Sequence, residues 1–243
     1  MEIQTRKIDY KVGDRTHEAY LAFDESGGAS RPGVIVLHEW WGVNDYIAKR
    51  THMLAELGYV ALAIDLYGAG KVAADPGEAA TLMNAVLGDM DQGTQALRAG
   101  YQLLLDQPRV DPQKTAAIGY CFGGAMALHM ARIGLPLKSV VSFHGALGSF
   151  HQAEPGTINP RVLVCHGAAD SMVTMDDVAT CKAEMDAAGA DYEVLLYADA
   201  KHGFSSQKAD ENARKYQLDV GYNAVADGAS WTEMKARFSQ AFA

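Results

Sequence analysis

The chain has 243 residues, with 21 Lys and Arg against 30 Asp and Glu, which gives a formal net charge of −9 with the histidines neutral. Apolar residues make up 49% and charged residues 21%, a composition typical of folded globular proteins and unlike that of disordered chains. The acidic balance, without a long Lys/Arg run, disfavours nucleic acid as a partner, because phosphate backbones are bound by clustered cations. No stretch approaches the ~18 apolar residues needed to cross a bilayer, and the first residues contain no apolar signal core. We therefore expect a cytoplasmic protein with no membrane partner.

Short apolar runs alternate with longer amphipathic stretches from residue 33 to the C-terminus, which is typical of an α/β fold. Segments 3–10 and 17–23 predict two strands that pair antiparallel at a sheet edge. A helix is predicted to begin near Asn44 or Asp45, to bury Ile47, Leu54 and Leu57 on one side, and to end at Gly58. The mostly continuous apolar runs predict a mostly parallel central sheet flanked by helices. The remaining strands are predicted at 33–38, 60–65, 115–119, 139–143, 161–165 and 193–197, and the remaining helices at 76–87, 90–106, 122–133, 174–189 and 226–241.

The chain offers no internal signal that would divide it. Pro108 and Pro112 are predicted to lie in the turn before the strand at 115–119. No internal repeat, low-complexity tract or Pro/Ser-rich linker is present. We therefore expect a single domain over residues 1–243, as a monomer or weak homo-oligomer.

The most informative segment is Gly119-Tyr120-Cys121-Phe122-Gly123, which follows a predicted strand and opens a helix of small residues. It has the G-x-C-x-G form of a turn that presents a nucleophile, in which glycines relieve crowding on both sides. The N-terminus of the following helix favours a thiolate and any oxyanion beside it. We predict that Cys121 is a nucleophile and that the Phe122 N–H is an oxyanion donor. The alternative is an ordinary buried thiol in a glycine-rich turn.

The other two cysteines have a different setting. Cys165 lies within an apolar strand run and Cys181 lies in the middle of a predicted helix, both without flanking glycines. No CxxC pair suited to zinc or redox exchange is present. We interpret Cys165 and Cys181 as free thiols that serve packing.

Asp170 and His202 follow Cys121 in the order nucleophile, acid, histidine. Asp170 lies in the loop after the strand at 161–165, and His202 lies in the loop after the strand at 193–197. Alone, an Asp in a turn is commonly a cap and a single His is commonly a surface residue. Three strand-end loops in this order predict a triad in which His202 holds the thiolate and Asp170 orients the imidazole.

Three further histidines, His38, His144 and His166, lie at strand ends on the same predicted rim. They are candidates to line the pocket, but none has the loop context of His202. With Glu39 they form no H-E-x-x-H spacing, so we expect no metal.

Five segments together resemble the dienelactone hydrolase family of α/β-hydrolases. The likeness covers the chain from residue 10 onward and implies an α/β-hydrolase fold and cofactor-free hydrolysis of the enol-lactone ring of carboxymethylenebutenolides. The segments are Leu37 to Asn44, Asp65-Leu66-Tyr67, Gly119 to Gly124, Gly167 to Asp170 and His202-Gly203-Phe204.

The resemblance assigns roles to two further residues. Glu39 matches a glutamate that contacts the resting thiol and moves when substrate binds, and the Trp40 N–H matches a second oxyanion donor. A carboxylate beside a thiol disfavours the thiolate by like-charge repulsion, so a gate at Glu39 makes physical sense. The alternative for Glu39 is a carboxylate satisfied by backbone N–H groups.

One departure from the family concerns the substrate. Its best-known members hold a substrate carboxylate with two arginines, one after the D-L-Y segment and one four residues after the catalytic histidine. Here the second position is Ser206, which cannot supply a forked cation, and the region after D-L-Y offers only Lys71. The insertion at 205–227 carries cations that could replace the clamp, namely Lys208, Arg214 and Lys215.

The predicted function is a cysteine hydrolase of small-molecule esters or lactones. Without the clamp, neutral activated substrates such as aryl esters become candidates, and phosphotriesters are a further one. Alternatives of another class are a catalytically silent protein that binds a small ligand or partner, and a thiol redox sensor, which would need a resolving cysteine near Cys121. Aromatic walls suit flat substrates, with core packing as the alternative for each residue. The predicted pocket residues are Trp41, Tyr67, Tyr120, Phe204, Ser206 and Lys71.

Overall fold

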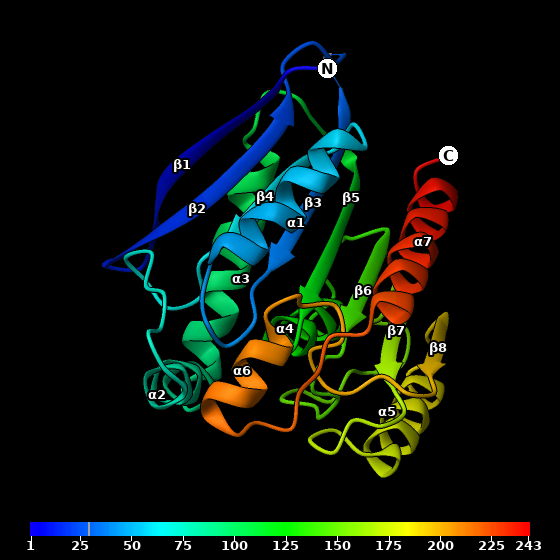
Figure 1. Cartoon of the computed structure of the whole chain (residues 1–243). Helices are drawn as coiled ribbons and strands as arrows, with labels where there is room; N and C mark the ends of the chain where they lie inside the picture. Colours follow the sequence, from blue (N-terminus) through cyan, green and yellow to red (C-terminus); the bar gives the residue numbers. More distant parts are fainter. Residues whose placement is uncertain (29) are drawn as a thin grey trace. The chain divides into compact units, whose positions relative to one another are not determined.

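The computed structural model describes residues 1–28 and 30–243 (Figure 1). Strands and helices alternate after the first two strands, as expected for an α/β fold. In chain order the elements are β1 (Ile3–Val12), β2 (Arg15–Asp24), β3 (Arg31–Leu37), α1 (Asp45–Glu56), β4 (Val60–Ile64), α2 (Pro76–Leu87), α3 (Met90–Leu105), β5 (Val110–Tyr120), α4 (Phe122–Arg132), β6 (Ser139–Phe143), β7 (Arg161–Gly167), α5 (Met175–Ala187), β8 (Tyr192–Tyr197), α6 (Ala209–Tyr216) and α7 (Ala224–Ala241).

The strands form an eight-stranded mixed sheet in the order β1-β2-β4-β3-β5-β6-β7-β8. The chain divides into two compact units, Met1–Ala117 and Ile118–Ala243, and the division falls within β5. The predicted fold class is confirmed, and the single domain stays a prediction.

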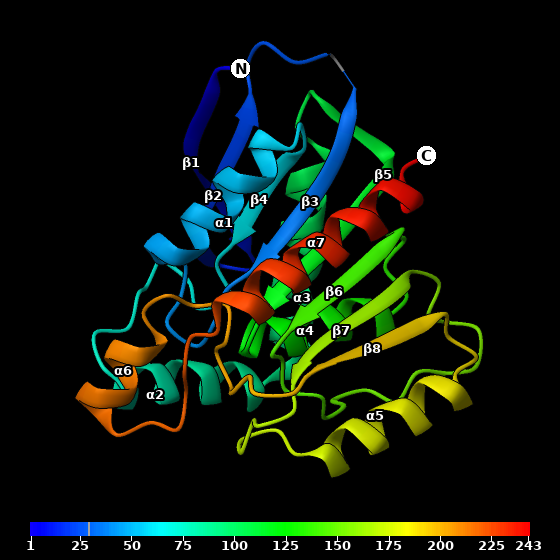
Figure 2. The same ribbon diagram turned by 45° about the vertical axis from the view of Figure 1, so that its right-hand side comes forward.

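The first unit contains the antiparallel edge that the sequence predicts. β1 pairs antiparallel with β2, β2 pairs antiparallel with β4, and β3 pairs parallel with β4. α1 packs on β2, β3 and β4, whereas α3 packs on β1, β3 and β4. Figures 1 and 2 show α1 in front of these strands and α3 behind them. Because both faces are covered, β3 and β4 are almost entirely buried.

The second unit is built on the parallel strands β6, β7 and β8. α4 packs against β6, and α7 packs against β6 and β7. Figure 2 shows α7 in front of these strands and α4 behind them. The carboxyl ends of β6, β7 and β8 therefore lie at one edge, where ligands bind in open α/β sheets.

Most helices begin where the sequence provides a cap. Asn44 caps α1 by accepting the Ile47 N–H at 3.2 Å. Thr174 and Asp177 form a reciprocal capping box at the start of α5. One packing detail of the prediction is wrong, because Leu57 follows the last turn of α1 and is 42% exposed.

Two other predictions need correction. Pro112 lies within β5, which begins five residues before the predicted start at 115, and not in the preceding turn. Its neighbours Asp111, Gln113 and Lys114 are only partly buried or exposed, the kind of strand end where a missing N–H is tolerated. The sequence also missed α6, a short helix in the region first seen as an insertion.

A buried ion pair joins α4 to α5. The Arg132 side chain is fully buried, and its guanidinium donates to both Glu184 carboxylate oxygens at 2.8 and 2.7 Å. Arg132 also donates to the Leu147 carbonyl at 3.2 Å. Burial of a charge is tolerated only with such compensation, so this pair fixes α5 beside α4.

We expect Glu184→Ala to lower the free energy of unfolding by about 3–5 kcal/mol, because it leaves the buried Arg132 guanidinium without its carboxylate counter-ion. The matched control is Glu25→Ala, which removes the half-exposed partner of Arg109 and should cost about 0–1 kcal/mol. Urea unfolding followed by circular dichroism measures both. Equal effects of the two substitutions would contradict the structural role of the buried pair.

Among the residues that the structure describes, no helix is both long and apolar enough to cross a bilayer.

Candidate active site

Cys121 occupies a strained turn between β5 and α4. Its backbone has φ 54° and ψ −119°, a region that non-glycine residues adopt at a cost of about 1–3 kcal/mol. The Cys121 N–H donates to the Phe143 carbonyl at the end of β6 at 3.0 Å, and the Cys121 carbonyl accepts the Gly124 N–H at 2.9 Å. The turn is therefore held by the sheet on one side and by the first turn of α4 on the other.

The glycines of the turn allow close backbone approach. A Cβ added to Gly119 would collide with the Gly123 carbonyl. A Cβ on Gly124 would lie 2.6 Å from the Ser142 hydroxyl and 2.7 Å from the Gly145 Cα. Side chains at either position would force the turn open, which is the physical reason for Gly119, the first glycine of the G-x-C-x-G pattern, and for Gly124 directly after that pattern.

Asp170 lies after β7, and its two carboxylate oxygens accept hydrogen bonds from different partners. Oδ1 accepts the N–H groups of Met172 and Val173 at 2.8 and 2.9 Å, and Oδ2 accepts from His202 Nδ1 at 2.8 Å. Burial alone would raise the pKa of Asp170, but these hydrogen bonds and the charge of His202 lower it below its ordinary value. Asp170 is therefore held as a carboxylate that orients the imidazole.

His202 lies between Asp170 and Cys121. Nδ1 faces Asp170, which leaves Nε2 for the hydrogen bond that the ring shares with the Cys121 side chain. Burial acts to lower the pKa of His202, but the charge of Cys121 and the hydrogen bonds to Asp170 and Cys121 raise it well above its ordinary value. The structure thus brings together the three residues that the sequence placed in separate strand-end loops.

A surface clamp joins the loops that carry Asp170 and His202. Ser171 and Lys201, their immediate neighbours in the chain, both bind the carboxylate of Asp219, at 2.5 and 2.6 Å. The Gly221 N–H then donates to the His202 carbonyl at 3.1 Å. The segment at 219–221 therefore holds both loops from the outside.

The three thiols differ in accessibility. Cys121 is partly exposed, whereas Cys165 and Cys181 are buried. Burial raises the pKa of Cys165 to about 12 and that of Cys181 to about 11. Because the thiolate is the reactive form, Cys165 and Cys181 are inert packing residues in the folded protein.

We expect one iodoacetamide adduct per folded chain at pH 7.5, located on Cys121, because only this thiol combines access with a cationic partner. Intact mass spectrometry followed by peptide mapping counts and places the adducts. Cys121→Ser should remove the adduct, and the matched Cys181→Ala should retain it. A second adduct of equal rate on Cys165 or Cys181 would contradict this assignment.

The raised pKa of His202 has a consequence for its titration. In the wild type the charge of Cys121 and the hydrogen bonds to Cys121 and Asp170 raise the pKa of His202 above its ordinary value. Cys121→Ser removes that charge, so the pKa of His202 should fall. Imidazole ¹⁵N shifts followed against pH measure it in both proteins, with an unchanged pKa as the contradicting result.

The other rim histidines lie in different settings. Burial lowers the pKa of His166, against the charge of Asp170. Burial likewise lowers the pKa of His38, whose Nε2 accepts the Leu66 N–H at 3.2 Å. Neutral imidazoles are therefore favoured at both positions.

In the first unit, hydrogen bonds join two of the segments that resemble the family, the one at 37–44 and the Asp65-Leu66-Tyr67 segment. His38 Nδ1–H donates to the Glu39 carbonyl at 2.5 Å, and the Tyr67 hydroxyl donates to the Trp40 carbonyl at 2.9 Å. Since Leu66 donates to His38, the D-L-Y loop fixes the backbone on both sides of Glu39. The Glu39 side chain is buried. The roles of Glu39 as a gate and of the Trp40 N–H as an oxyanion donor stay predictions.

The aromatic residues predicted to line the pocket differ in burial. Tyr120 and Phe204 are fully buried, and Tyr120 stacks on Phe143 at 4.9 Å, so these two side chains pack in the core. Trp41 is half-buried with its ring centroid 5.1 Å from that of Trp40.

The two polar candidates for the pocket belong to different units. Ser206 is buried in the turn that leads to α6. Lys71 is exposed and, together with Tyr67 and His17, lines a cavity of about 150 Å³ in the first unit.

Ser205 was not singled out from the sequence, although it contacts His144, one of the rim histidines. Its hydroxyl hydrogen-bonds with His144 Nε2 at 2.7 Å, across 61 positions of the chain. Its only sequence signal is its place three residues after His202.

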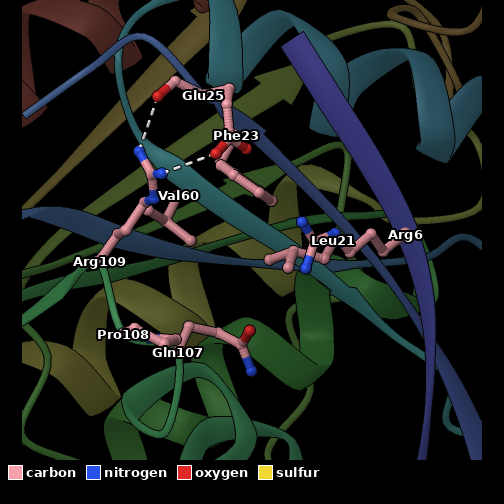
Figure 3. Close-up of a pocket in the computed structure, with 8 residues that line it drawn as sticks. All are labelled: Arg6, Leu21, Phe23, Glu25, Val60, Gln107, Pro108 and Arg109. Carbon is pink, nitrogen blue, oxygen red and sulfur yellow. Dashed lines mark hydrogen bonds and ion pairs between the residues drawn. The ribbon is translucent and has the colours of Figure 1, made fainter. Parts of the chain in front are cut away.

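Figure 3 shows another cavity, of about 300 Å³, at the amino ends of β4 and β5. The guanidinium groups of Arg6 and Arg109 each lie 5.4 Å from the Phe23 ring centroid, and Arg109 binds Glu25 at 2.9 Å. The lining contains no thiol or imidazole. It therefore offers no nucleophile, and it lies at the strand ends opposite to those where open α/β sheets bind ligands.

In residues 1–28 and 30–243, no three His, Cys, Asp or Glu side chains are grouped closely enough to hold a metal ion.

Comparisons with known proteins by sequence and by structure agree with one another. The profile of the dienelactone hydrolase family matches residues 17–242. A Synechocystis sp. protein, provisionally named a carboxymethylenebutenolidase, is 29% identical, with 98% of this chain and 97% of that protein covered. The solved structure of m3DLH is 35% identical, with a TM-score of 0.94 and full coverage of both chains. A dienelactone hydrolase-like promiscuous phosphotriesterase from metagenomic libraries is 34% identical, with a TM-score of 0.92 and full coverage of both chains.

Proposed function

Since the chain belongs to the dienelactone hydrolase family, we propose that it hydrolyses carboxylic esters or lactones through Cys121, His202 and Asp170. The observation that carries the proposal is the continuous hydrogen-bonded series from Asp170 Oδ2 through His202 to the Cys121 side chain. A partly exposed thiol on a strained turn completes it. These are the geometric roles of an activated nucleophile, its base and the group that orients the base.

In the first half of the reaction, the Cys121 thiolate attacks the substrate carbonyl carbon and a carbon–sulfur bond forms. The carbonyl electron pair moves to oxygen, and we assign the Phe122 and Trp40 N–H groups as its donors. When the tetrahedral intermediate collapses, the carbon–oxygen bond to the leaving group breaks. His202, cationic at this point, gives its Nε2 proton to the departing oxygen.

In the second half, water attacks the thioester while His202 takes a proton from it. Collapse of this intermediate breaks the carbon–sulfur bond, releases the carboxylic acid and regenerates the Cys121–His202 pair. With a lactone the alcohol and the acid leave as one ring-opened molecule. Asp170 stays ionised throughout and stabilises the imidazolium.

Glu39 is proposed as the gate of this reaction. A carboxylate that approaches a thiol opposes formation of the thiolate by like-charge repulsion. Movement of Glu39 on substrate binding would release the thiol to His202. Hydrogen bonds to the neighbouring carbonyls of Glu39 and Trp40 support a fixed backbone from which the side chain can move.

The substrate class is proposed from the charges around the second unit's site. Ser206 stands where the best-known members of the family have a carboxylate-binding arginine, and it is buried. The cations of the region at 205–227 are Lys208, Arg214 and Lys215, all exposed on or beside α6. This arrangement favours neutral activated esters over substrates that need a buried forked cation.

Phosphotriesters are a second candidate substrate, supported by the phosphotriesterase that is 34% identical over the full chain. The same thiolate would attack phosphorus and expel an aryl oxide, and water would then hydrolyse the phosphorus–sulfur bond. Neutral phosphotriesters, like neutral aryl esters, need no carboxylate clamp.

The test is steady-state hydrolysis of p-nitrophenyl acetate, a dienelactone and diethyl p-nitrophenyl phosphate by wild type, Cys121→Ser and Asp170→Asn. We expect turnover of the aryl ester, and a fall in kcat of about 10²- to 10⁴-fold in both variants, because the nucleophile or the orientation of its base is lost. Matched controls are Cys181→Ala, at a buried thiol, and Asp177→Asn, at an exposed cap.

Each pattern of substrates has a distinct meaning. Turnover of the dienelactone as well as the ester would extend the activity to the lactones of the family. Turnover of the phosphotriester that depends on Cys121 would establish the second candidate. If no substrate reacts and iodoacetamide leaves Cys121 unmodified, the proposal fails and a silent binding protein takes its place.

A further inference from the structure

His144 connects the end of β6 to the loops on both of its sides. Its N–H donates to the Cys165 carbonyl of β7 at 2.8 Å, while the preceding Phe143 carbonyl accepts the Cys121 N–H at 3.0 Å. Its φ of 39° is positive, a conformation that non-glycine residues seldom adopt. The backbone turn at His144 therefore lies directly between the nucleophile turn and the strand that leads to Asp170.

The His144 side chain is directed at the loop that carries His202. It is fully buried, and Nε2 hydrogen-bonds with the Ser205 hydroxyl at 2.7 Å. Its ring centroid lies 5.5 Å from that of His202 and 5.1 Å from that of Phe204, both in edge-to-face geometry. Three residues of one short loop thus contact a single imidazole.

We propose that His144 is a positioning residue that sets the His202 ring for transfer of a proton from Cys121. The proposal rests on the proposed function of Cys121, His202 and Asp170. Asp170 fixes one end of the His202 ring through Nδ1, and the other hydrogen bond of the ring goes to Cys121, the reacting group itself. The edge contact with His144 supports the ring from outside the reacting groups, and the hydrogen bond to Ser205 fixes the backbone three residues after His202.

The hydrogen bond distinguishes positioning from simple packing. A phenyl ring at position 144 would preserve the volume and the edge contacts, but it would leave the buried Ser205 hydroxyl without its imidazole partner. A glutamine can place an amide where the imidazole Nε2 lies and so restore the bond. The inference therefore predicts different outcomes for two substitutions that fill similar space.

We expect His144→Phe to lower kcat for p-nitrophenyl acetate about 10- to 100-fold with little change in KM, because small misplacement of a catalytic group costs rate at this scale. His144→Gln should recover most of the loss. The matched control is His129→Phe, at another buried histidine with aromatic ring neighbours in the same unit, which should leave kcat unchanged.

A second readout does not depend on turnover. The ¹⁵N titration of His202 reports its pKa, and His144→Phe should shift that pKa downward, since the ring then keeps a looser hold on Cys121 and Asp170. If His144→Phe fails to fold, Ser205→Ala removes the same hydrogen bond from the other side and should give the same shift. Wild-type kcat and an unshifted His202 titration in either folded variant would overturn the proposal.

The proposal and the function on which it rests fail in different ways. If Cys121→Ser is fully active, the proposed function fails whatever position 144 does. If Cys121→Ser is inactive but His144→Phe and His144→Gln lose activity equally, and only in proportion to a lower Tm, His144 serves packing alone.

Discussion

The strained backbone of Cys121 is the constraint on which the site depends. Its φ of 54° is held because its N–H binds the end of β6 and its carbonyl begins the hydrogen-bonding of α4. Neither element would hold the turn alone, since a free strand end or a frayed helix relaxes to ordinary dihedrals. The position of the sulfur therefore depends on close packing of β5, β6 and α4, which the glycines at 119 and 124 permit.

Charge compensation distinguishes His202, the proposed base, from two other buried histidines. His38, His166 and His202 are all buried, and burial acts to lower the pKa of each. Only at His202 do the charge of Cys121 and the hydrogen bonds to Cys121 and Asp170 reverse that effect. The difference arises from loop geometry, because Asp170 directs one carboxylate oxygen to its own loop and the other to His202. An imidazole whose pKa is raised by these neighbours is suited to receive a proton from a thiol and return it to a leaving group.

The sequence predicted the parts of the structure that local signals determine. Continuous apolar runs indicated the buried strands, and the G-x-C-x-G pattern indicated the turn at Cys121, since both depend on neighbouring residues. α6 escaped notice because its eight residues are largely polar and it has no side-chain cap. Tyr120 and Phe204 were predicted to line a pocket, yet they pack in the core, because motif proximity does not determine which side of the backbone a ring occupies. The contact of His144 with Ser205 joins residues 61 positions apart and has no local pattern.

Two of the four described non-glycine residues with positive φ lie where the proposed site needs a side chain. The non-glycine residues with positive φ are Ala69, Cys121, His144 and Gln217. Glycine would relieve the strain at each position, but Cys121 and His144 would then lose the sulfur and the imidazole that contact His202. Ala69 and Gln217 contribute no functional group to the site, so glycine there removes only a small side chain from a loop and an exposed one from the end of α6. Two strained residues at the ends of neighbouring strands, both directed at one histidine, are therefore better explained by chemistry than by folding. The stability lost at those two turns is offset by the buried strands, which lie outside the reacting groups.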